Sequence, residues 1–132
     1  MDGSKAKKIK KIKKTKTERE KRVIKENFMF SKVFKQGRYA SNNFLTVYAL
    51  KNYNRNAPVK LGVSVSAKNG GAVKRNRAKR VIREAFAALY GRIPRGYLIV
   101  VAGRGPCFDR ENKMHSVYES LESALARMKL LV

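Results

Sequence analysis

A cluster of basic side chains that contains no acidic residue lies in residues 68–83, KNGGAVKRNRAKRVIR. These sixteen positions hold seven Lys or Arg residues and no Asp or Glu. Side chains of one charge sign repel each other at this density unless a polyanion lies nearby. The chemistry that the cluster predicts is therefore the binding of phosphates.

The helix expected to carry these side chains spans residues 72–90. At about 100° per residue, its apolar and basic side chains separate onto two adjoining arcs. The apolar arc contains Ala78, Val81, Ile82, Ala85, Phe86 and Leu89. The basic arc contains Arg75, Asn76, Lys79, Arg80 and Arg83. One face should therefore pack into a core while the other displays charge.

Like charges face each other along the basic arc. Arg75 faces Lys79 and Lys79 faces Arg83, each pair four residues apart. The first acidic residue to offset them is Glu84. A solvated helix normally mixes charge signs, so a merely solvated basic face is the less favoured interpretation. Asn76 adds an amide that could bind a phosphate, a 2′-hydroxyl or a base edge, although polar residues near a helix start are common.

Length and composition bound the class of protein. The chain has 132 residues, 43% of them hydrophobic, and a formal charge of +23. This length fits one domain with a single modest core, and the charge calls for an acidic partner, RNA or DNA. A membrane is the competing polyanion, but the longest apolar strand, 97–102, is too short to span one, so no membrane partner is expected.

Cysteine and histidine usage excludes several kinds of site. Cys107 is the only cysteine and His115 the only histidine, so neither an intrachain disulfide nor a zinc site is expected. The lysines of the amino terminus precede no apolar block, unlike those of a secretory signal. We therefore expect a cytoplasmic protein from a reducing compartment, with no cofactor bound by the polypeptide itself.

Two regions differ in composition. Residues 1–22 hold eleven basic and three acidic residues, and after Met1 their only sizeable apolar side chains are Ile9 and Ile12. Such a segment cannot form a core, so residues 1–22 are predicted to be a disordered lysine-rich arm that could lie along phosphates. Residues 23–132 are predicted to form an RNA-binding α/β domain.

Hydrophobic periodicity predicts the elements of that domain. Helices are expected at 26–36, 72–90 and 112–128, and strands at 44–50, 60–66 and 97–102. Gly37 and Gly91 should end the first two helices, and Asn69 should cap the basic helix. The order of helix, strands, basic helix, strand and helix is typical of a two-layer α/β sandwich.

Two patterns leave alternatives open. In the first helix Phe30 and Phe34 share a stripe with Val33, and from spacing alone an aromatic stripe favours a core position. In strand 60–66 one side is apolar and the other is small and polar, and the second side includes Ser64. That small side is equally compatible with the floor of a groove and with a plain solvent-facing surface.

Several segments together carry a family resemblance. GAVKRNRAKRVIREAF, preceded by LGVSVS, resembles the signature region of the protein component of bacterial ribonuclease P. FSKVFKQG, TVYAL and YLIVVA occur in the order shown by that family, so the resemblance covers about residues 23–128.

This resemblance implies a small basic protein that binds ribonuclease P RNA and helps it remove the 5′ leader of precursor tRNA. It implies catalysis by the RNA, with Mg²⁺ bound there, and a sheet with a left-handed βαβ crossover. The implied contacts with the RNA subunit are Lys68, Arg75, Asn76, Arg77, Lys79, Arg80 and Arg83. The implied leader-binding groove contains Phe30, Phe34, Tyr48 and Ser64, which moves the two phenylalanines from a core position toward a partly exposed one.

Two other functions compete with this one. A structural RNA-binding protein of ribosomal type would have the same composition and a similar lysine-rich tail. A protein nuclease would need clustered carboxylates to hold Mg²⁺, whereas Asp109, Glu111, Glu119 and Glu122 are scattered over a loop and a helix. The nuclease is therefore the least favoured of the three.

Overall fold

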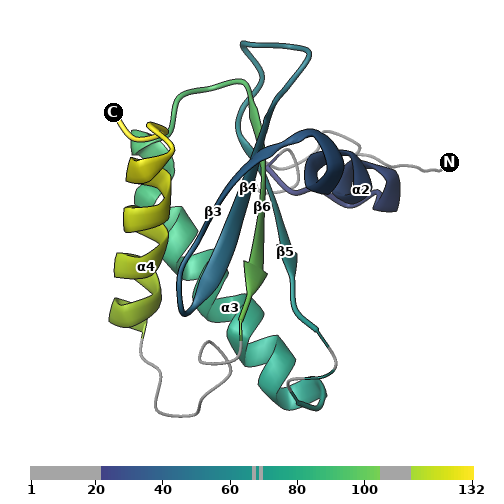
Figure 1. Cartoon of the computed structure of the whole chain (residues 1–132), viewed down its shortest axis with the longest axis vertical. Helices are drawn as coiled ribbons and strands as arrows, with labels where there is room; N and C mark the ends of the chain where they lie inside the picture. Colours follow the sequence, from purple (N-terminus) through teal and green to yellow (C-terminus); the bar gives the residue numbers. More distant parts are fainter. Residues whose placement is uncertain (1–21, 67, 69, 105–113) are drawn as a thin grey trace, which may run out of the picture.

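The structure is a computed structural model that describes residues 22–66, 68, 70–104 and 114–132. Residues 1–21 of the predicted arm, Asn69 and Cys107 lie outside the described residues. The elements, in chain order, are α2 (Asn27–Gln36), β3 (Arg38–Ser41), β4 (Leu45–Lys51), β5 (Lys60–Ser64), α3 (Ala72–Leu89), the 3₁₀ turn η2 (Tyr90–Arg92), β6 (Tyr97–Gly103) and α4 (Met114–Arg127) (Figure 1). The predicted helices and strands are thus confirmed to within about two residues at most ends, and β3 is an additional strand.

The strands form one four-stranded sheet in the order β3-β4-β6-β5. β4 pairs antiparallel with β3, to which a short turn joins it, and also antiparallel with β6, which follows later in the chain. β5 and β6 pair in parallel, and α3 connects them as a crossover helix. The handedness of this crossover stays a prediction.

The two faces of the sheet are covered differently. Successive strand residues point to opposite faces, so Val47 and Val101 join the main core with α3 and α4, whereas Val100 packs with Val33 of α2. The sheet and the helix pair α3–α4 make the two layers expected of a mixed α/β fold, and α2 adds a partial cover on the opposite face (Figure 1).

The basic helix α3 is anchored only from Ala78 onward. Its buried residues are Ala78, Ile82, Ala85, Phe86 and Leu89, as the apolar arc predicted, whereas Val81 is half-buried. The prediction of Asn69 as the N-cap is wrong, because the helix begins at Ala72 and Gly71 is the cap residue, without a side-chain cap. Gly91 does not end the helix directly but lies within η2.

Helix α2 ends in close contact with β4. The Gly37 N–H donates to Val33 O at 2.9 Å, and a Cβ atom built on Gly37 would lie 2.6 Å from Val33 O and 2.9 Å from Ala49 O. The φ angle of Gly37 is −79°, so close approach of two backbones, rather than a left-handed conformation, requires glycine here. This contact fixes where α2 lies on the sheet.

We expect Gly37→Ala to destabilise the protein by about 1–3 kcal/mol, because the added methyl group meets backbone atoms that cannot move aside as a side chain would. Thermal unfolding of the variant would measure the loss. Gly91→Ala is a matched control, since a Cβ atom there meets nothing within 4 Å. Equal melting temperatures for the two variants would show that α2 is not held by this contact.

Candidate nucleic-acid interface

The predicted RNA contacts of α3 form a continuous basic surface. Asn76, Arg80 and Arg83 are exposed, and Arg75, Arg77 and Lys79 are half-buried; Lys68, before the helix, is also exposed. No residue of α3 before Ala78 is buried, so the amino-terminal part of the helix contributes its side chains to the surface and not to the core. Substitutions there should therefore affect binding much more than folding.

Arg75 carries an unusual hydrogen-bond donor. Its Nε atom is buried and makes no hydrogen bond with any described residue. A buried donor without a partner costs about 1–3 kcal/mol. If the side chain turned toward a phosphate oxygen, this donor would form a hydrogen bond. Binding of an anion would therefore remove the cost that the unsatisfied Nε atom imposes on the free protein.

Helix α2 and the neighbouring strands form an aromatic face, which we define as Phe30, Phe34, Tyr39 and Tyr48. The ring centroids of Phe30 and Phe34 are 6.5 Å apart, and Phe34 meets Tyr48 edge-on at 4.8 Å. Tyr48 also contacts Tyr39 across the β3–β4 pair, at 5.9 Å. The four rings therefore form one connected line over α2, β4 and β3.

Burial separates the three side chains of the α2 stripe. Val33 is fully buried, whereas Phe34 is 38% exposed and Phe30 is half-buried. A core position, which spacing alone favoured for both phenylalanines, is therefore wrong for Phe34. The partly exposed position that the resemblance implied agrees with the structure, but a contact with a leader strand stays a prediction.

Next to the aromatic face lies a small-residue row. The sheet register aligns Ser41 with Thr46, Thr46 with Ala102, and Ala102 with Ser64. Thr46 is two residues from Tyr48 in β4, so this row shares the face of the rings. All four residues are half-buried. Ser64 is thus part of a floor of small side chains, which is wider than strand 60–66 alone indicated.

This face also contains two residues that the sequence pattern does not predict. Tyr39 is 69% exposed and belongs to β3, a four-residue strand too short to give a clear pattern. Arg104 donates from Nη1 to Ser41 Oγ at 2.8 Å and so places a cation at the end of the small-residue row. Only the strand register brings Arg104 to Ser41, which is far away in sequence.

The small-residue row and the start of α3 lie at the same end of the sheet. β5 runs toward Ser64, and the chain then enters α3 at Ala72 without crossing the sheet again (Figure 1). Lys68 lies on this connection. A single extended polyanion could therefore contact both the basic helix and the floor beside the aromatic face.

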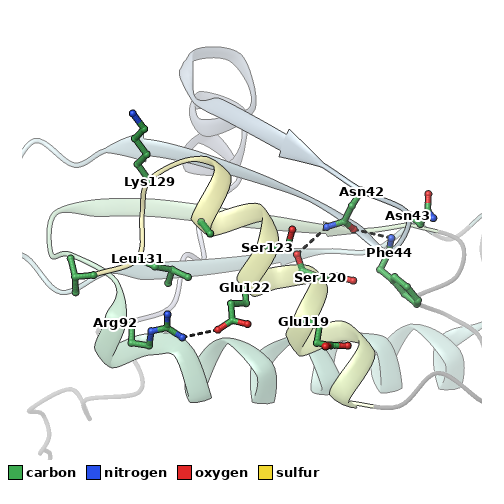
Figure 2. A pocket seen from close by; sticks show the side chains of 12 residues that line it. Asn42, Asn43, Phe44, Arg92, Glu119, Ser120, Glu122, Ser123, Lys129 and Leu131 are labelled. Atoms are coloured by element: carbon green, nitrogen blue, oxygen red, sulfur yellow. Dashed lines mark hydrogen bonds and ion pairs between the residues drawn. The ribbon is translucent and has the colours of Figure 1, made fainter.

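Another hollow lies elsewhere, between α4, the β3–β4 turn and the carboxyl-terminal segment (Figure 2). It is shallow, about 1000 Å³, and contains no residue that the sequence predicted as a site. Arg92 Nη1 donates to Glu122 Oε2 at 2.7 Å, a hydrogen bond that raises the pKa of Arg92, and Asn42 Nδ2 donates to Ser120 O. These contacts hold α4 against η2 and the β3–β4 turn. The carboxylates of Glu119 and Glu122 would repel phosphates.

The described part of the chain holds neither a group of metal-ligating side chains nor a membrane-spanning helix. No three His, Cys, Asp or Glu side chains come together there as a metal site would require. None of its helices has the length and apolarity needed to cross a lipid bilayer.

The fold and its two surfaces define a small α/β protein of the RNA-binding class, with a basic helix and an aromatic sheet face. The family model described as Ribonuclease P matches residues 18–129. The chain therefore belongs to the ribonuclease P protein family.

Two curated relatives illustrate the match in sequence. A protein of Clostridium beijerinckii named ribonuclease P protein component is 38% identical over 104 residues, which cover 71% of this chain and 83% of the relative. A protein of the same name from Shouchella clausii is 39% identical over 108 residues, covering 82% and 86% of the two chains.

Solved structures illustrate the match in fold. The ribonuclease P protein of Staphylococcus aureus superposes with a TM-score of 0.74 at 33% identity, over 84% of this chain and 98% of that one. The ribonuclease P protein of Thermotoga maritima superposes with a TM-score of 0.66 at 33% identity, over 76% and 90% of the two chains. The mixed α/β fold expected from the sequence is thereby confirmed.

Proposed function

We propose that this chain is the protein subunit of a ribonuclease P, which binds ribonuclease P RNA through α3 and holds the 5′ leader of precursor tRNA against its sheet. The observation that carries the proposal is the position of the basic surface and of the aromatic face on one small domain, with the small-residue row between the rings and the start of α3. Family membership supports the same assignment.

The basic helix suits a structured RNA. Its contacts are mainly guanidinium and ammonium groups, which neutralise phosphates without reading sequence, and Asn76 can add a hydrogen bond to a 2′-hydroxyl or base edge. Because the helix before Ala78 is free of core contacts, it can enter a groove or junction of the RNA without unfolding the sheet. The ten basic residues of segment 1–21 would add further phosphate contacts.

The aromatic face suits a single strand of variable sequence. Leaders differ between tRNAs, so their binding has to depend on stacking and backbone contacts rather than on a base code. Phe34 and Tyr39 present exposed ring surface, and the neighbouring small side chains leave room for a sugar-phosphate backbone. Arg104 offers a cation at the end of that path.

Hydrolysis of the precursor belongs, in this proposal, to the RNA subunit and its Mg²⁺ ions, in the cytoplasm where the tRNA is made. The carboxylates of α4 already have basic neighbours, since Glu122 pairs with Arg92 and Glu119 lies 3.3 Å from His115. They also lie on α4, which is on the face of the sheet opposite to α2 (Figure 1). The polypeptide contributes binding and positioning.

We expect the purified chain, freed of RNA by nuclease digestion and repurification, to leave precursor tRNA uncut at physiological magnesium. Adding an in vitro transcribed ribonuclease P RNA should restore cleavage at the 5′ end, and the RNA alone at the same magnesium concentration is the control. Cleavage by the RNA-free polypeptide would contradict the assignment of chemistry. Recovery of the chain only with ribosomal subunits would instead support the ribosomal alternative.

A further inference from the structure

A second hollow, of about 590 Å³, opens at the β5 edge of the sheet, between the start of the described chain and α3. It lies outside both the small-residue row and the amino-terminal part of α3. Its lining residues are Arg22, Val23, Ile24, Phe30, Leu61, Val63, Arg80, Arg83, Glu84, Phe86, Ala87 and Tyr90. We call it the edge hollow.

The interior of the edge hollow is apolar and its walls are fixed. Leu61 and Val63 of β5 face Phe86 of α3, and the ring of Phe30 lies so close to Gly62 that a Cβ atom there would be 2.7 Å from it. Leu61 N donates to Arg22 O and Ile24 N donates to Leu61 O, so the segment before α2 is paired to the strand edge. The hollow therefore exists in the free protein, as binding pockets usually do.

Its rim is cationic. Arg80, Arg83, Glu84 and Ala87 follow one another at i, i+3, i+4 and i+7 along one side of α3. Within the described part of the chain, neither Arg80 nor Arg83 has an ion-pair or hydrogen-bond partner. Arg22, across the hollow, stacks its guanidinium over the Tyr90 ring at 4.1 Å. An apolar interior behind unpaired guanidinium groups fits a ligand that combines a flat ring with a phosphate.

We propose that the edge hollow binds one unstacked nucleotide of the RNA that lies along α3. The base enters between Val63 and Phe86, and its phosphate binds Arg80 and Arg83. The Glu84 carboxylate can accept a hydrogen bond from an amino or imino group of the base. It would therefore favour bases that carry such a donor over bases that do not. This inference rests on the proposed function and adds to it a specific base-binding subsite, which shares only Phe30 with the aromatic face.

The competing occupant is the chain's own amino-terminal segment, which enters the fold at Arg22. Residues 1–21 hold ten basic residues, so the guanidinium groups of the rim would repel most of that segment. The same charges favour the opposite arrangement, in which residues 1–21 and the rim converge on one RNA.

Filling the hollow without changing any charge tests the proposal. Ala87 is exposed and lines the hollow, whereas Ala88 is exposed and does not line it, so Ala87→Phe and Ala88→Phe form a matched pair on one helix. We expect Ala87→Phe to weaken binding of ribonuclease P RNA by roughly 5- to 100-fold, the range for loss of one stacked base, with an unchanged salt dependence. Ala88→Phe should bind as the wild type does. Equal affinities for the two variants, at equal melting temperatures, would overturn the proposal.

A titration of the unmodified full chain gives a second test that no folding defect can affect. Adenosine 5′-monophosphate should shift the methyl NMR signals of Leu61 and Val63, and ribose 5-phosphate, which lacks the base, should not. The titration should extend far enough to detect an affinity about tenfold weaker than millimolar. If the nucleotide shifted neither signal over that range, base binding in the edge hollow would be rejected. Nuclear Overhauser contacts from Ile9 or Ile12 to these methyl groups in the free protein would assign the hollow to the chain itself and also overturn the proposal.

The two tests separate this inference from the proposed function. If the wild-type chain failed to bind ribonuclease P RNA at all, the proposed function would be wrong, while the nucleotide titration would still decide whether the hollow accepts a base. If the chain bound that RNA and the two alanine positions behaved alike, the function would stand and the edge hollow would not be part of it.

Discussion

Replacing Phe34 by alanine is expected to weaken binding of precursor tRNA to the assembled ribonucleoprotein by about 5- to 100-fold and to leave binding of mature tRNA nearly unchanged. Loss of one base stacked on an aromatic ring costs about 1–3 kcal/mol, and only the precursor carries a leader to stack. Phe34 lies inside the line of rings of the aromatic face, because its ring contacts both Phe30 and Tyr48. Equilibrium binding of the two tRNAs measures the difference directly.

The same helix supplies a control for this substitution. Phe28 is 68% exposed and lies about 200° around α2 from Phe30, so it faces away from the rings. Phe28→Ala should therefore leave both affinities unchanged. It removes the same ring from the same helix, so a non-specific effect of the truncation would appear in both variants.

Folding stability distinguishes the leader contact from a purely structural role of Phe34. A buried Phe→Ala change costs about 3–5 kcal/mol, but Phe34 keeps 38% of its surface exposed, so its loss should cost clearly less. The variant should melt only a little below the wild type. If Phe34→Ala instead melted early and lost precursor and mature tRNA in equal proportion, the leader contact would be rejected.

The sequence alone predicts those parts of the fold in which the hydrophobic pattern of a helix or strand is strong. The apolar and basic arcs of α3 predicted its bounds and its buried residues, since a helix 18 residues long gives several turns of pattern. β6 is buried along most of its length, and its run of β-branched residues predicts a buried strand. These elements carry their own signal because each contributes many side chains to one core.

Other parts depend on tertiary packing and could not be read in advance. Phe30, Val33 and Phe34 share one helical stripe, and only the way α2 lies on β4 decides that Val33 alone is fully buried. The strand β3 has four residues, two of them exposed, so it shows no alternation. Asn69 fitted the cap preference, yet the helix begins later, at Ala72.

The candidate site also has one part that local sequence predicts and another that depends on tertiary packing. The basic surface is local in sequence, because all its helical residues lie within three turns of one element. The small-residue row and the edge hollow combine residues from different strands and helices, and they need the strand order to be known. The sequence therefore predicts the candidate phosphate-binding residues more completely than the candidate base-binding residues.

The second large effect concerns the charges of α3. We expect each of the changes Arg75→Ala, Arg77→Ala, Lys79→Ala, Arg80→Ala and Arg83→Ala to lower the magnitude of the log K against log salt slope for ribonuclease P RNA by about 1, because each removes about one phosphate contact and its released counterion. Assembly titrations between 50 and 200 mM salt would measure these slopes. An unchanged slope for all five variants would contradict a phosphate-binding role of the helix.

A pair of double variants makes the comparison sharper. Arg80→Ala combined with Arg83→Ala should lower the slope by about 2 and weaken assembly by about 100-fold, since two charge-assisted contacts contribute about 1.5 kcal/mol each. Arg92→Ala combined with Lys129→Ala removes the same net charge at the shallow hollow of Figure 2. If binding depended on the overall charge of +23 alone, the two double variants would weaken assembly equally.

The thermal stability of these variants separates a binding role of the two arginines from a structural one. Arg80 and Arg83 are exposed and lie among like charges, so removing both relieves repulsion along α3 and should leave the melting temperature unchanged or slightly raised. A large loss of RNA affinity in a protein that folds as well as the wild type would assign the charges of α3 to binding. A lowered melting temperature in proportion to the lost affinity would instead mean that these arginines support the fold.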